Sequence, residues 1–342
     1  MNIEPLHDVS VPCDTEPKSD IIPDELLRWN VLYFSPSSIK VPPAYWLTNK
    51  ILLSEEFIKK KKPPVIARFG SIVHQLVDEV YFQKNDIKQV LQNVYRDLKK
   101  NHQGYDEKDF YKLDVFKDKF LTVYENLVSA LEELKITKCD LETPIDLELP
   151  NLLVPINGYT DGRTKTHVLE FKTKWNRIRE VASRYNVYKI TKNGDWSKTK
   201  RVFKFEYEAN EYAESLDCDS KIIFEDKHFE CDSPPVVKEP YSNDIMQLAL
   251  YCRATGLKPI LIYATERDFK IFTSDNCEAL QPQSLSDYVE KARRIALARQ
   301  ALLLLAKDKQ QLVSLIEPPD LSEFWWDLGD DVITEVRKLW KI

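Results

Sequence analysis

The spacing of the apolar residues changes near Leu141, and this change constrains the fold more than any other feature of the sequence. Between residues 66 and 134 apolar side chains recur every three or four positions, which is typical of helices that bury one face. After Leu141 they alternate with polar residues, which is typical of half-buried strands. The predicted helices span 66–80, 87–98 and 107–134. The predicted strands span 145–149, 153–161 and 167–173.

The rest of the chain predicts further strands and helices around one irregular stretch. Residues 176–240 have no clear period, and short strands are expected there at 202–207 and 221–224. A helix is predicted from Ser242 to Thr255, because Gly256 is typical of a helix C-terminus. Strands at 260–265 and 269–273 and helices at 286–307 and 330–339 follow. We expect a loosely ordered segment at 1–28, a helical region at 29–140, and an α/β core at 141–342 with an insertion at about 176–240.

Several common classes of protein and site are excluded by sequence pattern. The chain has 7 glycines in 342 residues and neither of the common glycine-rich phosphate-binding motifs, so no nucleotide cofactor is expected. Its 6 cysteines include no C-x-x-C pair, so free thiols are expected and no zinc site. The longest apolar runs, 260–264 and 302–306, are far below the roughly 18 residues of a membrane span. Because the N-terminus is acidic, unlike a secretory leader, we expect a cytoplasmic protein with no membrane partner.

Charge is divided sharply along the predicted insertion. The net charge of the chain is −6, which by itself disfavours a nucleic-acid partner. Residues 163–204, however, contain 13 Lys or Arg and 3 Asp or Glu, whereas 205–244 contain 3 Lys and 12 Asp or Glu. Two interpretations are open: a local positive surface on an acidic protein, or two blocks that neutralise each other in a solvated insertion.

Two carboxylates and a lysine are the strongest chemical signal in the sequence. In the predicted strand 167–173, Glu170 and Lys172 share one face, because side chains alternate with period two. A hairpin turn would bring Asp161, at the end of the preceding strand, alongside Glu170. Mg²⁺ prefers one or two protein carboxylates and completes its octahedron with water and phosphate oxygens. The pattern therefore indicates a divalent-metal site with a cation beside it.

Three more segments accompany this site. Gly70-x-x-x-His74 lies in the early helix, and Gln247 and Tyr251 are four residues apart in the later helix, so they share one helical face. Phe34-Ser35-Pro36-Ser37-Ser38 is typical of the start of a short helix.

Together, Asp161, Glu170-Phe171-Lys172, Gly70-x-x-x-His74 and Gln247-x-x-x-Tyr251 resemble the PD-(D/E)xK nuclease superfamily, in particular its RecB-like exonuclease branch with phage and mitochondrial-type exonucleases. The segment 34–38 is similar to the usual opening of that branch. The resemblance implies a restriction-endonuclease-like core, with a mixed central sheet flanked by helices and an N-terminal helical region. It also implies a Mg²⁺- or Mn²⁺-dependent DNA exonuclease that hydrolyses phosphodiester bonds of single-stranded DNA or duplex ends in recombination, repair or replication.

The resemblance also assigns roles to residues. Asp161 and Glu170 would bind the metal with the backbone carbonyl of Phe171, and His74 would be a further ligand. Lys172 would be the catalytic lysine, Gln247 would position it or the phosphate, and Tyr251 would line the site. Further residues near these elements are candidates for DNA binding: Ser37, Ser38, Arg163, Lys165, Thr173, Lys174 and Arg177.

Two features depart from the family pattern. Only Cys277 follows the Gln247 helix, so the iron–sulfur cluster of some relatives is not expected, and 74 residues separate Lys172 from Gln247, which indicates an insertion. The alternatives are a structure-specific or flap endonuclease with the same site, the nuclease subunit of a helicase–nuclease complex, and, less favoured, a non-catalytic DNA-binding module. A helicase or a single-strand-annealing protein would be the partner protein, in a bacterial or phage-infected cell.

Overall fold

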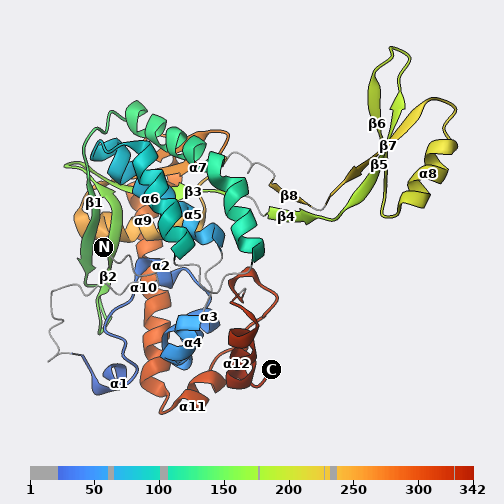
Figure 1. The fold of residues 1–342 in the computed structure, drawn as a ribbon. Helices are drawn as coiled ribbons and strands as arrows, with labels where there is room; N and C mark the ends of the chain where they lie inside the picture. The colour runs from blue at the N-terminus through green and yellow to red at the C-terminus, as the bar shows by residue number, and fades with distance from the viewer. Residues whose placement is uncertain are drawn as a thin grey trace.

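The computed structural model describes residues 22–60, 65–100, 107–175, 178–226, 228–231, 237–326 and 328–342. Its centre is a mixed five-stranded sheet with the order β1-β2-β3-β9-β10 (Figure 1). The strands are β1 (Asp140–Leu147), β2 (Ile156–Arg163), β3 (His167–Thr173), β9 (Lys258–Ala264) and β10 (Phe269–Thr273). β3 and β9 run parallel, and the other neighbours run antiparallel. The α/β class and the mixed sheet flanked by helices are therefore confirmed.

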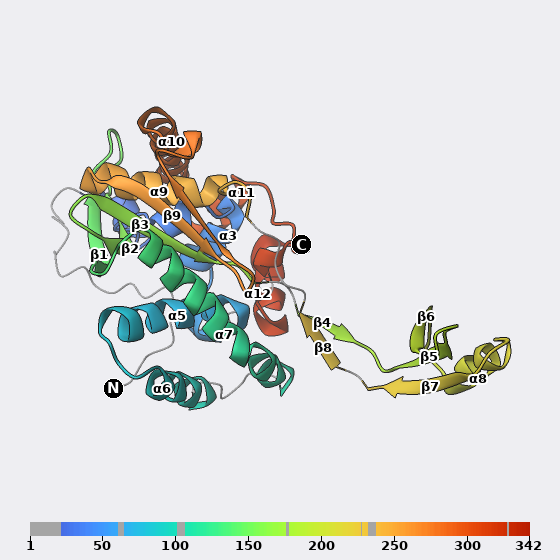
Figure 2. The same ribbon diagram turned by 90° about the horizontal axis from the view of Figure 1, so that it is seen from above.

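Helices cover both faces of this sheet (Figure 2). On one face, Leu169 and Phe171 of β3 pack against α5 (Val65–Leu76) and α7 (Glu107–Glu133), with α6 (Ile87–Lys100) outside them. A π-helical segment, Val77–Phe82, continues α5. On the other face, Val168 and Leu261 pack against α9 (Ser242–Thr255). β9 is buried after its first residue, because helices lie on both of its faces.

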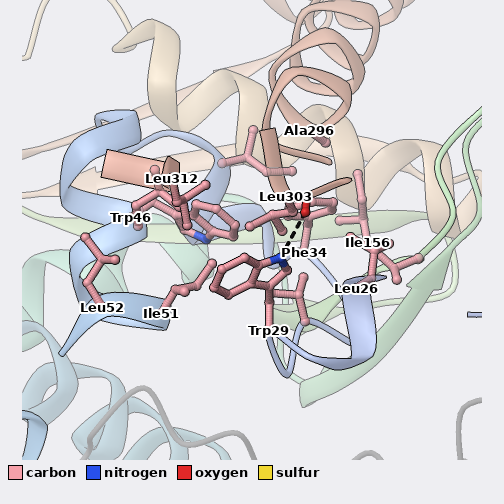
Figure 3. Close-up of a cluster of buried hydrophobic side chains, with 14 of the residues drawn as sticks. Leu26, Trp29, Phe34, Trp46, Ile51, Leu52, Ile156, Ala296, Leu303 and Leu312 are labelled. Carbon is pink, nitrogen blue, oxygen red and sulfur yellow. Dashed lines mark hydrogen bonds between the residues drawn. The ribbon is translucent and has the colours of Figure 1, made fainter. Parts of the chain in front are cut away.

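A second core joins the N-terminal helices to the C-terminal ones (Figure 3). Trp29 packs there with Leu26, and its indole nitrogen donates to the Leu303 carbonyl at 2.9 Å. Residues 1–21 of the segment expected to be loosely ordered lie outside the described residues, and within 22–28 Leu26 is fully buried, because α10 completes an apolar pocket that the local sequence cannot reveal. The N-terminal elements are α1 (Asp24–Leu27), α2 (Pro36–Ile39), α3 (Pro43–Leu47), a π-helical segment (Thr48–Leu52) and α4 (Glu55–Lys60). The C-terminal elements are α10 (Pro282–Leu305), α11 (Lys309–Ser314) and α12 (Asp330–Trp340), with short 3₁₀ turns at Glu278–Leu280 and Phe324–Trp326.

The chain between β3 and α9 forms an arm that projects away from the rest of the molecule (Figures 1 and 2). β4 (Ile178–Val181) and β8 (His228–Cys231) pair as its stalk. Its outer part is a three-stranded sheet, β6-β5-β7, with one helix. These elements are β5 (Arg184–Ile190), β6 (Trp196–Phe203), α8 (Glu206–Glu214) and β7 (Ser220–Glu225).

The predicted strand at 202–207 is wrong beyond Phe203. Alternating aromatic residues suggested a strand there, but Glu206 begins α8, whose Ala209 is fully buried. Tertiary packing of Ala209, together with acidic residues in the first turn, outweighs the local alternation. Among the described residues, no helix is long and apolar enough to cross a membrane.

Candidate functional site

Asp161 on β2 and Glu170 on β3 lie side by side on neighbouring strands. The backbone N–H of Phe171 donates to Asp161 Oδ2 at 2.6 Å, which holds this carboxylate beside Glu170. Glu170 is fully buried, and its Oε1 accepts a hydrogen bond from Lys172. Its other oxygen, Oε2, is buried and has no hydrogen-bond partner in the described structure. Such an oxygen is costly to leave unpaired, so it marks a place where a cation would be stabilised.

Burial and mutual repulsion perturb both carboxyl groups. The pKa of Glu170 is raised to about 7, chiefly by burial and next by the negative charge of Asp161, while Lys172 acts in the opposite direction. Burial also raises the pKa of Asp161, while Lys172 and the Phe171 N–H lower it. Lys172 therefore offsets only part of the cost of placing two carboxylates next to each other at a largely buried position, which is typical of functional sites.

Lys172 lies between these carboxylates and helix α9. Burial alone would lower its pKa, but the charges of Glu170 and Asp161 outweigh burial, and the pKa is raised. Lys172 is therefore an ammonium group at neutral pH in this arrangement. Its Nζ lies 3.4 Å from Gln247 Oε1.

Gln247 connects the lysine to the rest of α9. Its Nε2 donates to the Tyr251 hydroxyl at 2.8 Å, as their four-residue spacing on one helical face allows. Burial raises the pKa of Tyr251 well above its ordinary value, so this hydroxyl stays neutral. Gln247 thus accepts from Lys172 on one side and is held by Tyr251 on the other.

A second lysine, Lys40, enters the site from the end of α2, and the sequence reasoning missed it. Its Nζ donates to Gln247 Oε1 at 2.9 Å and lies 3.7 Å from Asp244 Oδ1. Burial, followed by repulsion from Lys172, lowers the pKa of Lys40. Asp244 was missed as well, although it lies three residues before Gln247 on the same helix. It also accepts from the Tyr263 hydroxyl at 2.7 Å.

His74 approaches the site from the opposite face of the sheet. Its ring lies 5.8 Å from the Phe171 ring, and burial, followed by the charge of Lys172, lowers its pKa to about 4. The imidazole is therefore neutral at pH 7, which is the form that binds metals. Gly70 allows this approach, because a Cβ there would lie 3.1 Å from Thr173 Oγ1. Glu142 on β1, with a φ of 44°, acts electrostatically on both His74 and Asp161 and was also missed.

The donor set fits a hard divalent cation only in part. Within the described ranges, no group of three or more His, Cys, Asp or Glu side chains could hold a metal ion together. The structure thus does not gather His74, Asp161 and Glu170 into one ligand set. Two carboxylates nevertheless suffice for Mg²⁺ when water and phosphate supply the other ligands. The unpartnered Glu170 Oε2 and the raised pKa of both carboxyl groups fit such an ion.

The predicted DNA-binding residues lie in three places. Ser37 is exposed, but Ser38 is buried and its hydroxyl closes the capping box of α2 with Ser35. Arg163 and Lys165 lie at the turn before β3, whereas Thr173 and Lys174 lie at its other end. Thr173 accepts from the Trp175 indole at 2.9 Å, and Lys174 lies 3.7 Å from Asp244. Arg177 lies outside the described residues.

No family model, curated protein or solved structure matches the chain.

Proposed function

We propose that this chain is a divalent-metal-dependent DNA exonuclease with a restriction-endonuclease-like core of the PD-(D/E)xK type. The observation that carries the proposal is the pair formed by half-buried Asp161 and fully buried Glu170, with Lys172 beside it. The resemblance of the motifs to the RecB-like branch supports the same function. Three of the four motifs lie on elements that border one site: Asp161 on β2, Glu170 and Lys172 on β3, and Gln247 on α9.

Each residue then has a distinct task. Asp161, Glu170 and the Phe171 carbonyl would hold Mg²⁺ or Mn²⁺, and the resemblance adds His74, which the structure does not gather with the two carboxylates. When bound, such an ion polarises a phosphodiester and lowers the pKa of water. Lys172, which is cationic here, would stabilise negative charge that develops on the phosphate.

Gln247 and Lys40 would complete the phosphate-binding side of the site. The oxygen of Gln247 accepts from both lysines, so it holds two cations close together beside the carboxylates. A scissile phosphate would exchange these contacts for charge-assisted hydrogen bonds to the two ammonium groups. Tyr251 would fix the Gln247 amide so that its oxygen continues to face the lysines.

The test is degradation of end-labelled single- and double-stranded DNA with Mg²⁺, Mn²⁺ or EDTA. We expect cleavage that requires the metal and is lost in Lys172→Ala. Lys270→Ala is the matched control, because Lys270 is an exposed lysine on β10 of the same sheet. Cleavage that persists in EDTA or in Lys172→Ala would refute the mechanism.

A covalently closed single-stranded circle separates the remaining alternatives. An exonuclease leaves the circle intact, whereas cutting as fast as on the linear strand would identify an endonuclease. DNA binding without turnover on any substrate would instead identify a non-catalytic binding module.

A further inference from the structure

We propose that the open face of the arm sheet β6-β5-β7 is a binding site for single-stranded DNA. This inference rests on the proposed nuclease function for its biological meaning, but binding to the arm can be measured without cleavage. Three properties of the arm support such binding: a sheet covered on one face, aromatic residues among lysines on the other face, and concentration of opposite charges in different elements.

Helix α8 covers one face of the arm sheet. Val187 of β5 and Ala209 of α8 are fully buried between them. The Ser220 hydroxyl of β7 donates to the Ala213 carbonyl at 3.3 Å, and the Phe203 ring of β6 lies 5.2 Å from that of Tyr212. All three strands therefore contribute to the covered face.

Aromatic residues and lysines share the other face. Tyr188 lies opposite Lys198 on β6 and Lys221 on β7, and Ile190 lies opposite Trp196, so these side chains point to the same side of the sheet. Lys221 Nζ lies 4.5 Å from the centre of the Trp196 ring. Trp196 is nevertheless 44% exposed, so its ring is accessible to a partner on this face.

Opposite charges are concentrated in different elements of the arm, although the Arg201 guanidinium lies over the Tyr212 ring of α8. Residues 184–204, which form β5 and β6, contain seven Lys or Arg and one Asp, whereas residues 205–219, which include α8, contain six Asp or Glu and no Lys or Arg. Among these described residues, no ion pair joins the two groups. The ion pairs of Arg184 and Lys198 go to Glu225 on β7. Glu225 of the acidic block thus offsets part of the basic block, but Arg184, Lys198 and Lys221 outnumber it on the open face, so a local positive surface remains there.

This combination matches a single strand better than a duplex. Phosphates are attracted to the lysines of the open face and repelled by α8, so the charge pattern selects which side is bound. Unpaired bases can stack on exposed aromatic rings, and each such contact contributes about 1–3 kcal/mol by alanine substitution. Bases in a duplex are not available to Trp196 in this way.

The position of the arm links this surface to the candidate active site. The stalk strand β4 begins at Ile178, soon after Lys172 on β3, and the chain returns from the arm just before α9, which carries Gln247. A strand held on the arm would therefore be tethered beside the site. We expect long single strands to bind and to be degraded better than short ones, because the second contact acts at a high effective concentration.

The experiment measures fluorescence anisotropy of a labelled oligothymidylate with the full-length protein in EDTA. We expect Trp196→Ala to weaken binding about tenfold, Trp196→Phe to retain most of it, and Lys198→Ala to weaken it and reduce its salt dependence. Tyr207→Ala is the matched control, because Tyr207 is 61% exposed but lies in α8. We expect it to change nothing.

Unchanged binding in both Trp196→Ala and Lys198→Ala would overturn the proposal, and so would an equal loss in Tyr207→Ala. Cleavage of a trinucleotide in Mg²⁺ separates this failure from failure of the proposed function. If the arm alone is misassigned, the trinucleotide is still cut. If the nuclease function is wrong, nothing is cut, while the binding results in EDTA still decide the role of the arm.

Discussion

Replacement of Glu170 by glutamine should make the metal-free protein more stable at alkaline pH. The pKa of Glu170 is raised from 4.5 to about 7, chiefly by burial. The folded state therefore holds this proton more tightly than the unfolded state. Its contribution to stability is fully present below pH 4.5 and is lost as the pH rises through about 7. Glutamine keeps the shape and the acceptor oxygen for Lys172, but it has no charge to desolvate.

The expected magnitude follows from the shift. At 1.36 kcal/mol per pKa unit, the ionised Glu170 costs roughly 2–3 kcal/mol of folding free energy between pH 5 and pH 8. We expect Glu170→Gln to be near neutral in urea unfolding at pH 5 with EDTA, and to exceed the wild type by about that amount at pH 8. The pH dependence of the wild-type unfolding free energy would not by itself reveal the cost of ionising Glu170. The lowered pKa of His74, about 4, makes the opposite contribution, which is present above pH 6.5 and lost as the pH falls.

Two further measurements make the prediction decisive. Glu290→Gln is the control, because hydrogen bonds from Arg293 and Arg294 hold the pKa of Glu290 at about 2, so its difference from wild type should not change between pH 5 and pH 8. Addition of Mg²⁺ should stabilise the wild type and leave Glu170→Gln unchanged, because a ligand stabilises only the state that binds it. A Glu170→Gln difference that is the same at pH 5 and pH 8 would refute the reasoning that burial opposes ionisation of Glu170.

Three other predictions concern the surroundings of the site. His74→Gln should raise the Mg²⁺ concentration for half-maximal cleavage by about 10- to 100-fold. The urea midpoint in EDTA should stay within error of the wild-type value. An unchanged metal requirement would remove His74 from the ligand set. Lys40→Met should slow cleavage about tenfold without loss of stability, because methionine fills the space without a buried charge; a full-rate enzyme would exclude a role in phosphate binding. Gly158→Ala should destabilise the fold by about 1–3 kcal/mol in urea unfolding, because the added Cβ would lie 2.8 Å from the rigid Pro36 ring, and a neutral result would mean that α2 shifts freely over β2.

Short-range relationships in the site could be predicted from the sequence because backbone geometry determines them. The alternation of β3 is enough to separate Leu169 and Phe171, which pack against α5 and α7, from Glu170 and Lys172. In the same way, the four-residue spacing in α9 places Gln247 within reach of Tyr251. Which side chains share a face within β3 or within α9 depends on no other part of the chain.

Contacts between distant segments were decided by the tertiary structure. Lys40 and Gln247 are 207 residues apart, and they meet because α2 packs against both β2 and α9. Whether residues 202–207 form a strand or begin a helix likewise depended on β5 and β7, against which Ala209 packs. No local period in the sequence encodes that packing.

The change of apolar spacing near Leu141 thus determined that a helical part precedes a sheet, and local spacing determined which side chains share a face of that sheet. Only the tertiary structure decided that a second lysine enters the site and that Glu170 keeps a buried oxygen without a partner. It also decided that the charged insertion becomes an arm that projects from the rest of the molecule (Figure 1). The physical reason is that backbone periodicity acts over a few residues, whereas burial and electrostatic compensation depend on every segment that packs around a group.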